Sequence, residues 1–387
     1  METRLPSWFL ALTVGCLLLA SSCSNDHATT PVAVASAPLL VTSQSDLTVA
    51  SYKMDMSTGR LTANGTPLST GAGSVPNAAI IVGNAAFVAN GSSNDIARFS
   101  INSDGTLTVQ SGNQATGNNP VAMVVDQTGK LLFVANQGDQ TVSVFKVSGT
   151  SLTLTSTMAT AGDPAALVVA PAGNHLYVAN SSNGTISGFT FSSSGALTPM
   201  AQGPFSSLGS TPSALAITPD GRYLFVANYG SNDVAGFTLC TIMNSICPAA
   251  DGSLVPYLNA PYLTGVAPRS MVITSAGSSL CDPMIGCTYY LFIANQFSNQ
   301  VSMFTAVPTV DPLTNLVTDQ LKPNNPAIIS TGSNPVAIAV PSTGGFAFVA
   351  NSGSSSVSSF TIRPDGLLLA NGAPVPTGGQ PSSLGPK

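Results

Sequence analysis

Few side chains in this sequence could take part in chemistry. Only 7% of the 387 residues are charged, and there are two histidines and six cysteines. The most distinctive candidate is an arginine directly after a proline, which could pair with a carboxylate or a phosphate. Four aspartates and two aromatic residues occupy loops that we expect on the same side of the fold. Together they form a candidate ligand-binding set: Arg269, Asp163, Asp233, Asp139, Asp95, Tyr229 and Phe297.

No residue pattern typical of catalysis accompanies this set. The sequence has no Gly-x-Ser-x-Gly nucleophile elbow and no pair of carboxylates at a recognisable spacing. His27 lies in a Pro/Ala/Thr-rich segment. His175 is expected in the first hairpin turn of its repeat, on the side opposite the candidate loops, so we interpret it as structural. A water activated by Asp163 or Asp233 is the remaining route to hydrolysis, and the sequence identifies no catalytic residue.

Four cysteines are expected to form disulfides rather than to bind a metal. They form two closely spaced pairs in the stretch where the chain is longer than its own repeat. In an oxidising compartment this favours the local bonds Cys240–Cys247 and Cys281–Cys287, although four cysteines allow three pairings. Neither pair has Cys-x-x-Cys spacing and no histidine is nearby, which argues against zinc. No Asp-Gly turn has the ligand pattern of a calcium loop. We expect no metal and no cofactor.

The first 38 residues are expected to lie outside the fold. Arg4 and the apolar stretch 8–20 have the layout of an export signal, and the stretch is short for a membrane span. The small residues before Cys23 resemble the lipobox of bacterial lipoproteins. We interpret 1–22 as a lipoprotein-type signal peptide, Cys23 as the lipidated residue and 23–38 as a flexible tether. Without lipidation the protein would be secreted. Either reading places it outside the cytoplasm of a bacterium, with a lipid anchor as its sole contact with a membrane.

Repeated strands must position the candidate residues. Six four-letter words (FVAN four times, YVAN and FIAN once each) end in asparagines whose positions differ by 46, 44, 48, 67 and 56. In every copy the sixth residue after the asparagine is Val or Ile, and the ninth is Phe. A period in the mid-forties is typical of four-stranded propeller blades. The asparagines are Asn90, Asn136, Asn180, Asn228, Asn295 and Asn351.

The clearest repeat, residues 211–239, predicts how a blade is built. A proline precedes a short apolar strand at 213–218, and an Asp-Gly turn leads to a second strand at 222–228. Continuous apolarity of the second strand indicates that both of its faces are covered. A third strand at 234–239 follows, and then a variable fourth. The asparagine occurs in each blade, so we interpret it as structural: asparagine accepts unusual backbone angles and can hydrogen-bond the turn after it.

A seventh copy begins the fold. Ser43 takes the asparagine position, and Val49 and Tyr52 follow six and nine residues later. This copy has no first strand, but the C-terminal residues carry the Gly-x-Pro pattern that precedes first strands elsewhere. We therefore predict an all-β fold, a seven-bladed β-propeller of four-stranded antiparallel blades at 39–387. The C-terminal strand joins the N-terminal blade and closes the ring, which removes open sheet edges. We expect a monomer.

The segment PSALAITPDGRYLFVANYGSNDVAGFT resembles YVTN-type repeats and the lactonase-like seven-bladed propellers, a family that includes 6-phosphogluconolactonase. The resemblance covers 39–387 and implies a propeller fold and action on lactones. Members of this group carry His, Arg and acidic residues around the channel mouth, usually with one blade that reads like PHAHS. Here the matching positions read PVAMV, PAALV, PSALA, PRSMV and PVAIA, without histidine.

Two functional hypotheses follow. A nucleic-acid partner is excluded because the net charge is −5 and no basic cluster is visible. The hypothesis that the sequence favours is a binding or interaction module that presents its loop face to a protein or a carbohydrate. Its support is the scarcity of titratable groups and the Ser/Asn/Gly-rich loops. The alternative, a lactonase-like hydrolase acting on a sugar lactone, is supported by the resemblance, and fold-level likeness is a poor guide to chemistry.

Overall fold

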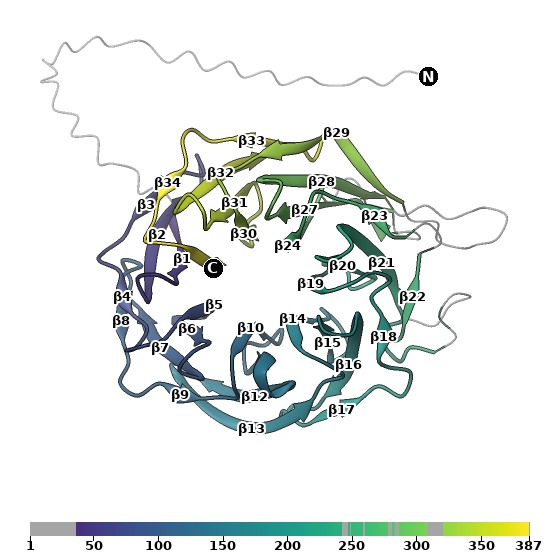
Figure 1. Ribbon diagram of the computed structural model, residues 1–387, viewed down its shortest axis with the longest axis horizontal. Helices are drawn as coiled ribbons and strands as arrows, with labels where there is room; N and C mark the ends of the chain where they lie inside the picture. Colours follow the sequence, from purple (N-terminus) through teal and green to yellow (C-terminus); the bar gives the residue numbers. More distant parts are fainter. Residues whose placement is uncertain are drawn as a thin grey trace, which may run out of the picture. The chain divides into compact units, whose positions relative to one another are not determined.

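Each repeat of the sequence folds into one antiparallel sheet, and the seven sheets are arranged in a ring (Figure 1). The computed structural model describes residues 36–241, 247, 249–257, 260–277, 281–282, 286–307 and 320–386. The predicted signal peptide, most of the tether and Cys23 lie outside the described residues. Among the described residues, no helix has the length and apolarity needed to cross a bilayer.

Blades 1 to 3 are formed by residues 36–159 together with the C-terminal strand. Blade 1 comprises β1 (Ser36–Ser43), β2 (Thr48–Asp55), β3 (Leu61–Ala63), β4 (Leu68–Ser69) and β35 (Pro381–Pro386). Blade 2 comprises β5 (Pro76–Val82), β6 (Ala85–Asn90), β7 (Asp95–Ile101), β8 (Leu107–Val109) and β9 (Gln114–Ala115). Blade 3 comprises β10 (Pro120–Val125), β11 (Leu131–Asn136), the 3-10 helix η1 (Gln137–Asp139), β12 (Thr141–Ser148) and β13 (Ser151–Ala159).

Blades 4 to 7 follow in chain order. Blade 4 comprises β14 (Pro164–Val169), β15 (His175–Asn180), β16 (Thr185–Phe191), β17 (Leu197–Pro199) and β18 (Phe205–Ser206). Blade 5 comprises β19 (Pro212–Ile217), β20 (Tyr223–Asn228), β21 (Asp233–Leu239), β22 (Leu254–Pro256) and β23 (Tyr262–Leu263). Blade 6 comprises β24 (Pro268–Ser275), β27 (Tyr289–Asn295), β28 (Gln300–Val307) and β29 (Gln320–Ser330), with the inserted hairpin β25 (Cys281–Asp282) and β26 (Gly286–Cys287). Blade 7 comprises β30 (Pro335–Ala339), β31 (Phe346–Asn351), β32 (Ser356–Ile362), β33 (Leu368–Ala370) and β34 (Val375–Pro376).

The repeated words are the second strands of their blades, as predicted. Every residue of β6, β11, β15, β20 and β27 is buried, because neighbouring blades cover both faces of these strands. The buried apolar residues form seven clusters, and each joins two adjacent blades. The cluster that contains Phe225 and Leu291, for example, joins blades 5 and 6. The core is therefore a ring of interfaces between blades, stabilised mainly by apolar burial.

The ring closes through the C-terminal strand, as the sequence indicates. In β35, Leu384 pairs with Val41 of β1, so the last strand becomes the innermost strand of the first blade. A hydrogen bond of 2.7 Å joins the hydroxyls of Thr42 and Ser382 at the same junction. Blade 1 begins at Ser36, three residues before the predicted boundary.

Candidate functional site at the channel mouth

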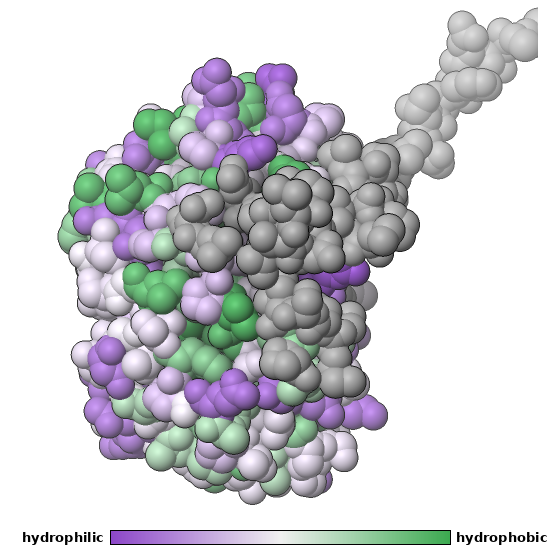
Figure 2. Space-filling model, turned by 90° about the vertical axis from the view of Figure 1, so that its right-hand side faces the viewer, coloured by the Kyte–Doolittle hydropathy of each residue, from purple (hydrophilic) through white to green (hydrophobic). Residues whose placement is uncertain are grey.

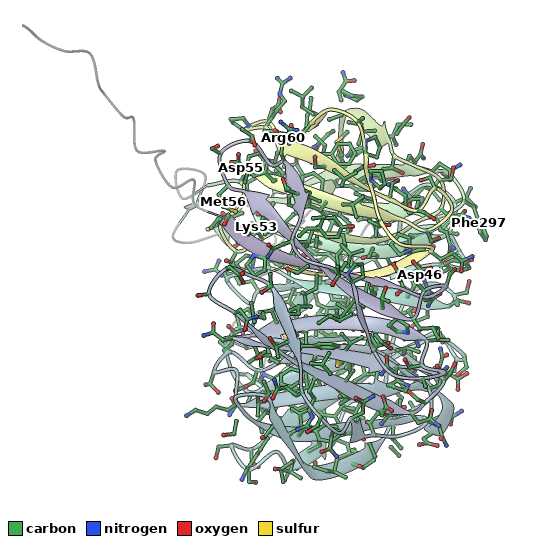
Figure 3. All side chains as sticks on the ribbon, turned by 90° about the vertical axis from the view of Figure 1, so that its left-hand side faces the viewer. Asp46, Lys53, Asp55, Met56, Arg60 and Phe297 are labelled. Carbon is green, nitrogen blue, oxygen red and sulfur yellow. A yellow bond between two sulfur atoms is a disulfide. The ribbon has the colours of Figure 1, made fainter. Side chains whose placement is uncertain are left out.

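Two loops of every blade lie on one face of the ring. One is the loop before the first strand, here called the Pro loop because the strand starts at proline. The other is the turn between the second and third strands. In each blade the residue after the second strand donates its backbone N–H to the carbonyl of the residue before the proline, as Tyr229 does to Thr211 at 2.9 Å. We call this side the mouth face. Figure 3 shows Phe297 and Asp46 on it, and Lys53 and Arg60 on the opposite face.

The repeated asparagine and a glycine of the Pro loop hold these two loops together. All six asparagines are fully buried. Asn228 donates through Nδ2 to the carbonyl of Ser207 at 3.2 Å and to Oδ1 of Asp233 at 2.8 Å. Gly209 lies against its amide, so closely that a Cβ there would be 2.4 Å from Nδ2. Gly117, Gly265 and Gly332 lie against the asparagines of blades 3, 6 and 7 in the same way, whereas in blade 4 Gly162 meets Ser182 and Asn183.

The predicted reason for the asparagines was partly wrong. Five of the six donate to the residue that begins the third strand, as Asn136 does to Thr141, and Asn295 donates to Ser302 within that strand. None of the six has a positive φ, and Asn136 has φ −100° and ψ 96°. The left-handed residue lies four positions later, as Gln140 does at φ 54°. The asparagine is needed because its amide can donate to two groups at once while fully buried.

The centre of the mouth face holds a cavity of about 630 Å³. Among the described lining residues, carboxamides are the most frequent and Arg269 is the one charged side chain. Tyr229 and Arg269, both predicted at the mouth, line the cavity, whereas the carboxamides were not predicted. The lining comprises Gln44, Asn77, Asn119, Val121, Gln137, Tyr229, Arg269, Gln296, Asn334, Val336, Ser352, Gly353, Gln380, Pro381 and Ser382.

Most of the lining residues occupy equivalent positions in their blades. The lining comes almost entirely from three kinds of position: the residue before a blade's proline, the residue after it, and the residue after its second strand. Blade 4 contributes none of its three. In blade 6 the last two positions are Arg269 and Gln296. Every lining residue except Gly353 and Pro381 occupies one of these positions.

Carboxamides of blades 1 to 3 form a hydrogen-bonded chain along one arc of the mouth. Gln44 donates to Oδ1 of Asn77 at 3.1 Å, and Asn77 donates to the carbonyl of Pro120 at 3.0 Å and more weakly to Oδ1 of Asn119 at 3.5 Å. Asn119 donates to Oε1 of Gln137 at 3.1 Å. An amide carries two donor hydrogens and an acceptor oxygen, so each of these groups keeps some capacity for a ligand. This arc can present donors and acceptors to a polyhydroxylated molecule.

The opposite arc carries the cation. Arg269 is solvent-exposed, and among the described residues it has no carboxylate within ion-pair distance and no hydrogen-bond partner. Tyr229 lies beside it in the lining, and its ring meets that of Phe297 edge-on with centroids 6.1 Å apart. Phe297 is 60% exposed and stands at the rim. A guanidinium free of internal partners is available to an anionic or carbonyl oxygen of a ligand.

The four predicted aspartates lie on the mouth face but do not line the cavity; each accepts hydrogen bonds from nearby amides. Asp95 and Asp233 accept from Asn90 and Asn228, a position that Thr141 fills in blade 3. The backbone N–H and side-chain amide of Asn118 donate to Asp139 at 2.7 and 2.6 Å.

In blade 5 the place of Asp139 is taken by Ser231, which accepts the backbone N–H of Ser210 at 3.0 Å. Asp163 accepts from Gln140 at 2.7 Å, across the boundary between blades 3 and 4. These contacts give the four carboxylates a role in holding loops.

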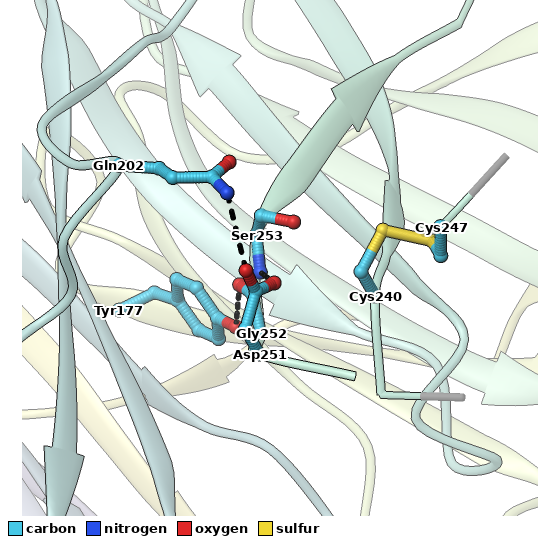
Figure 4. Close-up of a disulfide and its surroundings, with 7 residues drawn as sticks. All are labelled: Tyr177, Gln202, Cys240, Cys247, Asp251, Gly252 and Ser253. Atoms are coloured by element: carbon cyan, nitrogen blue, oxygen red, sulfur yellow. Dashed lines mark hydrogen bonds between the residues drawn. A yellow bond between two sulfur atoms is a disulfide. The ribbon is translucent and has the colours of Figure 1, made fainter. Parts of the chain in front are cut away.

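His175 lies on the face opposite the mouth, as expected, but at the first position of β15 rather than in the hairpin turn. It is 7% exposed, and burial lowers the pKa of its imidazole below the ordinary value. Its neighbour Asp251 has a pKa below the usual range because of hydrogen bonds from Ser253. Burial also raises the pKa of Tyr177, whose hydroxyl donates to the carbonyl of Gly252 at 2.6 Å (Figure 4). These groups join blades 4 and 5 far from the cavity.

A disulfide on this opposite side stabilises the same junction. Cys240 and Cys247 are bonded, as the local pairing predicts. The carbonyl of Cys240 accepts the N–H of Gly252 at 2.8 Å, which connects the disulfide loop to the turn that Tyr177 contacts. Figure 4 shows the disulfide beside this turn. Cys287 is also disulfide-bonded, and its cross-strand pair in the β25–β26 hairpin is Cys281, whose side chain lies outside the described residues. Among the residues that the structure describes, no three His, Cys, Asp or Glu side chains lie together as a metal site would require.

Comparisons with known proteins agree on the architecture. The sequence model of a family described as "Lactonase, 7-bladed beta-propeller" matches residues 41–161 and 148–244, which is more than half of the chain. No curated protein matches in sequence. A protein of Bacteroides fragilis NCTC 9343, provisionally named a 6-phosphogluconolactonase, superposes with a TM-score of 0.68 at 18% identity, over 93% of this chain and 99% of that one. The periplasmic gluconolactonase PpgL of Pseudomonas aeruginosa superposes with a TM-score of 0.64 at 18% identity, over 90% and 98%.

Proposed function

Because this chain belongs to the seven-bladed β-propeller lactonase family, we propose that it is a lactonase-like hydrolase that binds a sugar lactone at the mouth. One observation carries the proposal: among the described residues Arg269 has no internal partner, and it is the one charged side chain of a lining made otherwise of carboxamides and uncharged residues. Family membership supports this function better than the binding module that the sequence alone favours.

The lining suits the chemistry of a lactone. Carboxamides can donate to and accept from sugar hydroxyls, which positions the ring. The Arg269 guanidinium would donate to the lactone carbonyl oxygen. Water from solvent adds to the carbonyl carbon, the ring C–O bond breaks, and the ring oxygen takes one proton of that water while the acid releases the other. The guanidinium would stabilise the oxyanion of the intermediate and then the carboxylate of the product.

Charge on the mouth face favours an unphosphorylated lactone. The loops around the cavity hold Asp46, Asp95, Asp139, Asp163 and Asp233, whereas Arg269 is the one cation among the described lining residues. A dianionic phosphate in the cavity would be repelled by these carboxylates, because the electrostatic potential of charges around a cleft extends over several ångströms. Glucono-1,5-lactone is therefore the substrate we expect to be used in preference to its 6-phosphate.

We also propose that the protein works outside the cytoplasm. The support is the Cys240–Cys247 disulfide, since such bonds persist in oxidising compartments. The signal-like N-terminus and the lipobox-like residues before Cys23 add to it. Labelling with a radioactive fatty acid would test the lipid anchor: the wild-type chain should incorporate the label and Cys23→Ala should not.

Hydrolysis of glucono-1,5-lactone by the purified protein, followed by proton release, tests the enzymatic function. We expect turnover above the buffer rate and a loss of about 100-fold in kcat for Arg269→Gln, the effect of removing one oxyanion donor. The matched control is Arg222→Gln on the opposite face, where the arginine pairs with Asp220 at 3.8 Å. A rate equal to that of buffer across a panel of lactones would refute catalysis.

The second candidate function is sugar binding without turnover. It is favoured by the lining itself, in which no described residue is a carboxylate, an imidazole or a thiol that could act as a base. Calorimetry with gluconate separates the two: binding that depends on Arg269, without hydrolysis of the lactone, would establish a binding module.

A further inference from the structure

We propose that the lactone is the terminal unit of an oligosaccharide, and that a second sugar ring stacks on an aromatic shelf at the rim of the cavity. The shelf consists of Tyr229, Phe297 and Val266. This inference rests on the proposed function for the lactone end, and it adds a separate subsite with its own ligand chemistry.

The side chains of the shelf are held in place by hydrogen bonds and ring contacts between loops. Phe297 is 60% exposed and Val266 is 50% exposed, although neither belongs to a strand. The backbone N–H of Phe297 donates to the carbonyl of Val266 at 3.2 Å, and Ser298 Oγ accepts the N–H of Val266 at 2.6 Å. Tyr229 contacts the Phe297 ring from the neighbouring blade. Three loop segments of blades 5 and 6 therefore fix the two rings in place.

The position of the shelf distinguishes it from other exposed apolar residues. The flank of the ring shows apolar side chains scattered among polar ones (Figure 2), and such scatter carries no meaning by itself. The shelf instead continues directly into the cavity, because Tyr229 and the neighbours Arg269 and Gln296 all line it. A ligand held by Arg269 can extend over Tyr229 to Phe297 without leaving the protein surface.

The size of the cavity supports a ligand larger than one ring. A volume of about 630 Å³ lies in the middle of the range of roughly 300–1,000 Å³ that drug-sized ligands occupy. A single six-carbon lactone is much smaller than such a ligand and would leave most of the lining unused. Two linked sugar rings would engage both the carboxamides and the shelf.

The chemistry of the shelf points to a sugar ring as its occupant. A pyranose has a face of C–H groups that packs on an aromatic ring, while its hydroxyls radiate sideways towards polar partners. Gln296, next to Phe297 in the chain, lines the cavity on that side and can accept or donate such bonds. A purely alkyl substituent would pack on the two rings but would give the Gln296 amide no hydrogen-bond partner.

The test compares cellobiono-1,5-lactone with glucono-1,5-lactone. We expect kcat/KM to be about tenfold higher for the disaccharide lactone. Phe297→Ala should lower the disaccharide value roughly five- to tenfold, the usual worth of a stacked ring, and change the monosaccharide value less than about twofold. Leu369→Ala, which removes another exposed apolar side chain from the outer strand β33, is the control. Equal kcat/KM for the two lactones, or equal loss on both in Phe297→Ala, would overturn the proposal.

Binding of the ring-opened acids keeps this test separate from that of catalysis. If neither lactone is hydrolysed, the proposed enzymatic function fails, and calorimetry with cellobionate and gluconate then decides on the shelf. Tighter binding of cellobionate that is lost in Phe297→Ala supports the subsite. Equal affinity for the two acids refutes it.

Discussion

Replacing Gly209 by alanine tests whether the contact between the Pro loop and the asparagine holds the mouth in place. A Cβ at Gly209 would lie 2.4 Å from Nδ2 and 2.5 Å from Cγ of Asn228, and 2.5 Å from Oγ of Ser231. Asn228 is fully buried and cannot move into solvent. The methyl group must therefore displace the amide or push the loop outwards.

The expected cost follows from the hydrogen bonds that this displacement would break. Asn228 loses its bonds to the Ser207 carbonyl and the Asp233 carboxylate, the second of which is charge-assisted. A neutral bond contributes about 1 kcal/mol and one to a charged group about 1.5–3 kcal/mol. We therefore expect Gly209→Ala to lower the free energy of unfolding by about 3 kcal/mol.

Guanidinium denaturation followed by tyrosine fluorescence measures this loss. Gly203→Ala is the matched control, because a Cβ there meets nothing closer than 3.6 Å and its φ is not in the left-handed region. The control should change stability by less than about 0.5 kcal/mol. If Gly209→Ala is as stable as Gly203→Ala, the loop yields freely and the explanation of the repeated motif is wrong.

Two further predictions concern the face opposite the mouth. Because burial lowers the pKa of His175, the unfolded chain takes up a proton below its ordinary value of 6.5 while the folded chain does not; stability should therefore fall as the pH drops below about 6.5. Denaturation at pH 7.5 and pH 5 should show a smaller fall in His175→Asn, and an identical fall would contradict this. Replacing both Cys240 and Cys247 by serine should lower the unfolding free energy by about 2–3 kcal/mol through loop entropy, yet leave lactone turnover unchanged. Loss of turnover in a folded double variant would show that this junction reaches the mouth.

The fold could be predicted from the sequence because every blade of the ring needs the same residue types at the same positions. Each second strand must be apolar on both faces, and each Phe of a third strand fills an interface between blades, as Phe237 and Phe304 do. These apolar positions recur at a fixed spacing within each blade, so they can be recognised in the sequence alone. The strand that closes the ring was also predictable, since the first copy lacks one strand and the last residues supply it.

The site was harder to predict because its residues do not repeat. Aspartates attracted attention as charged groups, yet Asp139 has the same loop-holding role as Ser231 in another blade. The carboxamides that dominate the lining, such as Asn77 and Gln137, look like ordinary loop residues in the sequence. Their role depends on which positions of a blade point to the channel, which only the geometry of the ring reveals.

In the mouth loops, different groups hold the propeller together and face the ligand. At the three mouth positions of each blade the fold uses the backbone: the residue before the proline gives its carbonyl, and the residue after the second strand gives its N–H, as Thr211 and Tyr229 do. The pairing at the positions before the proline and after the second strand therefore does not depend on the side chains, whereas at the third position Ser213 and Ser382 also bond the neighbouring blade. A chain of this family can exchange the histidines expected at the mouth for carboxamides and one arginine and keep the same ring. It follows that activity in this family should track the side chains at these positions rather than overall identity, and that Arg269 is the first residue to test.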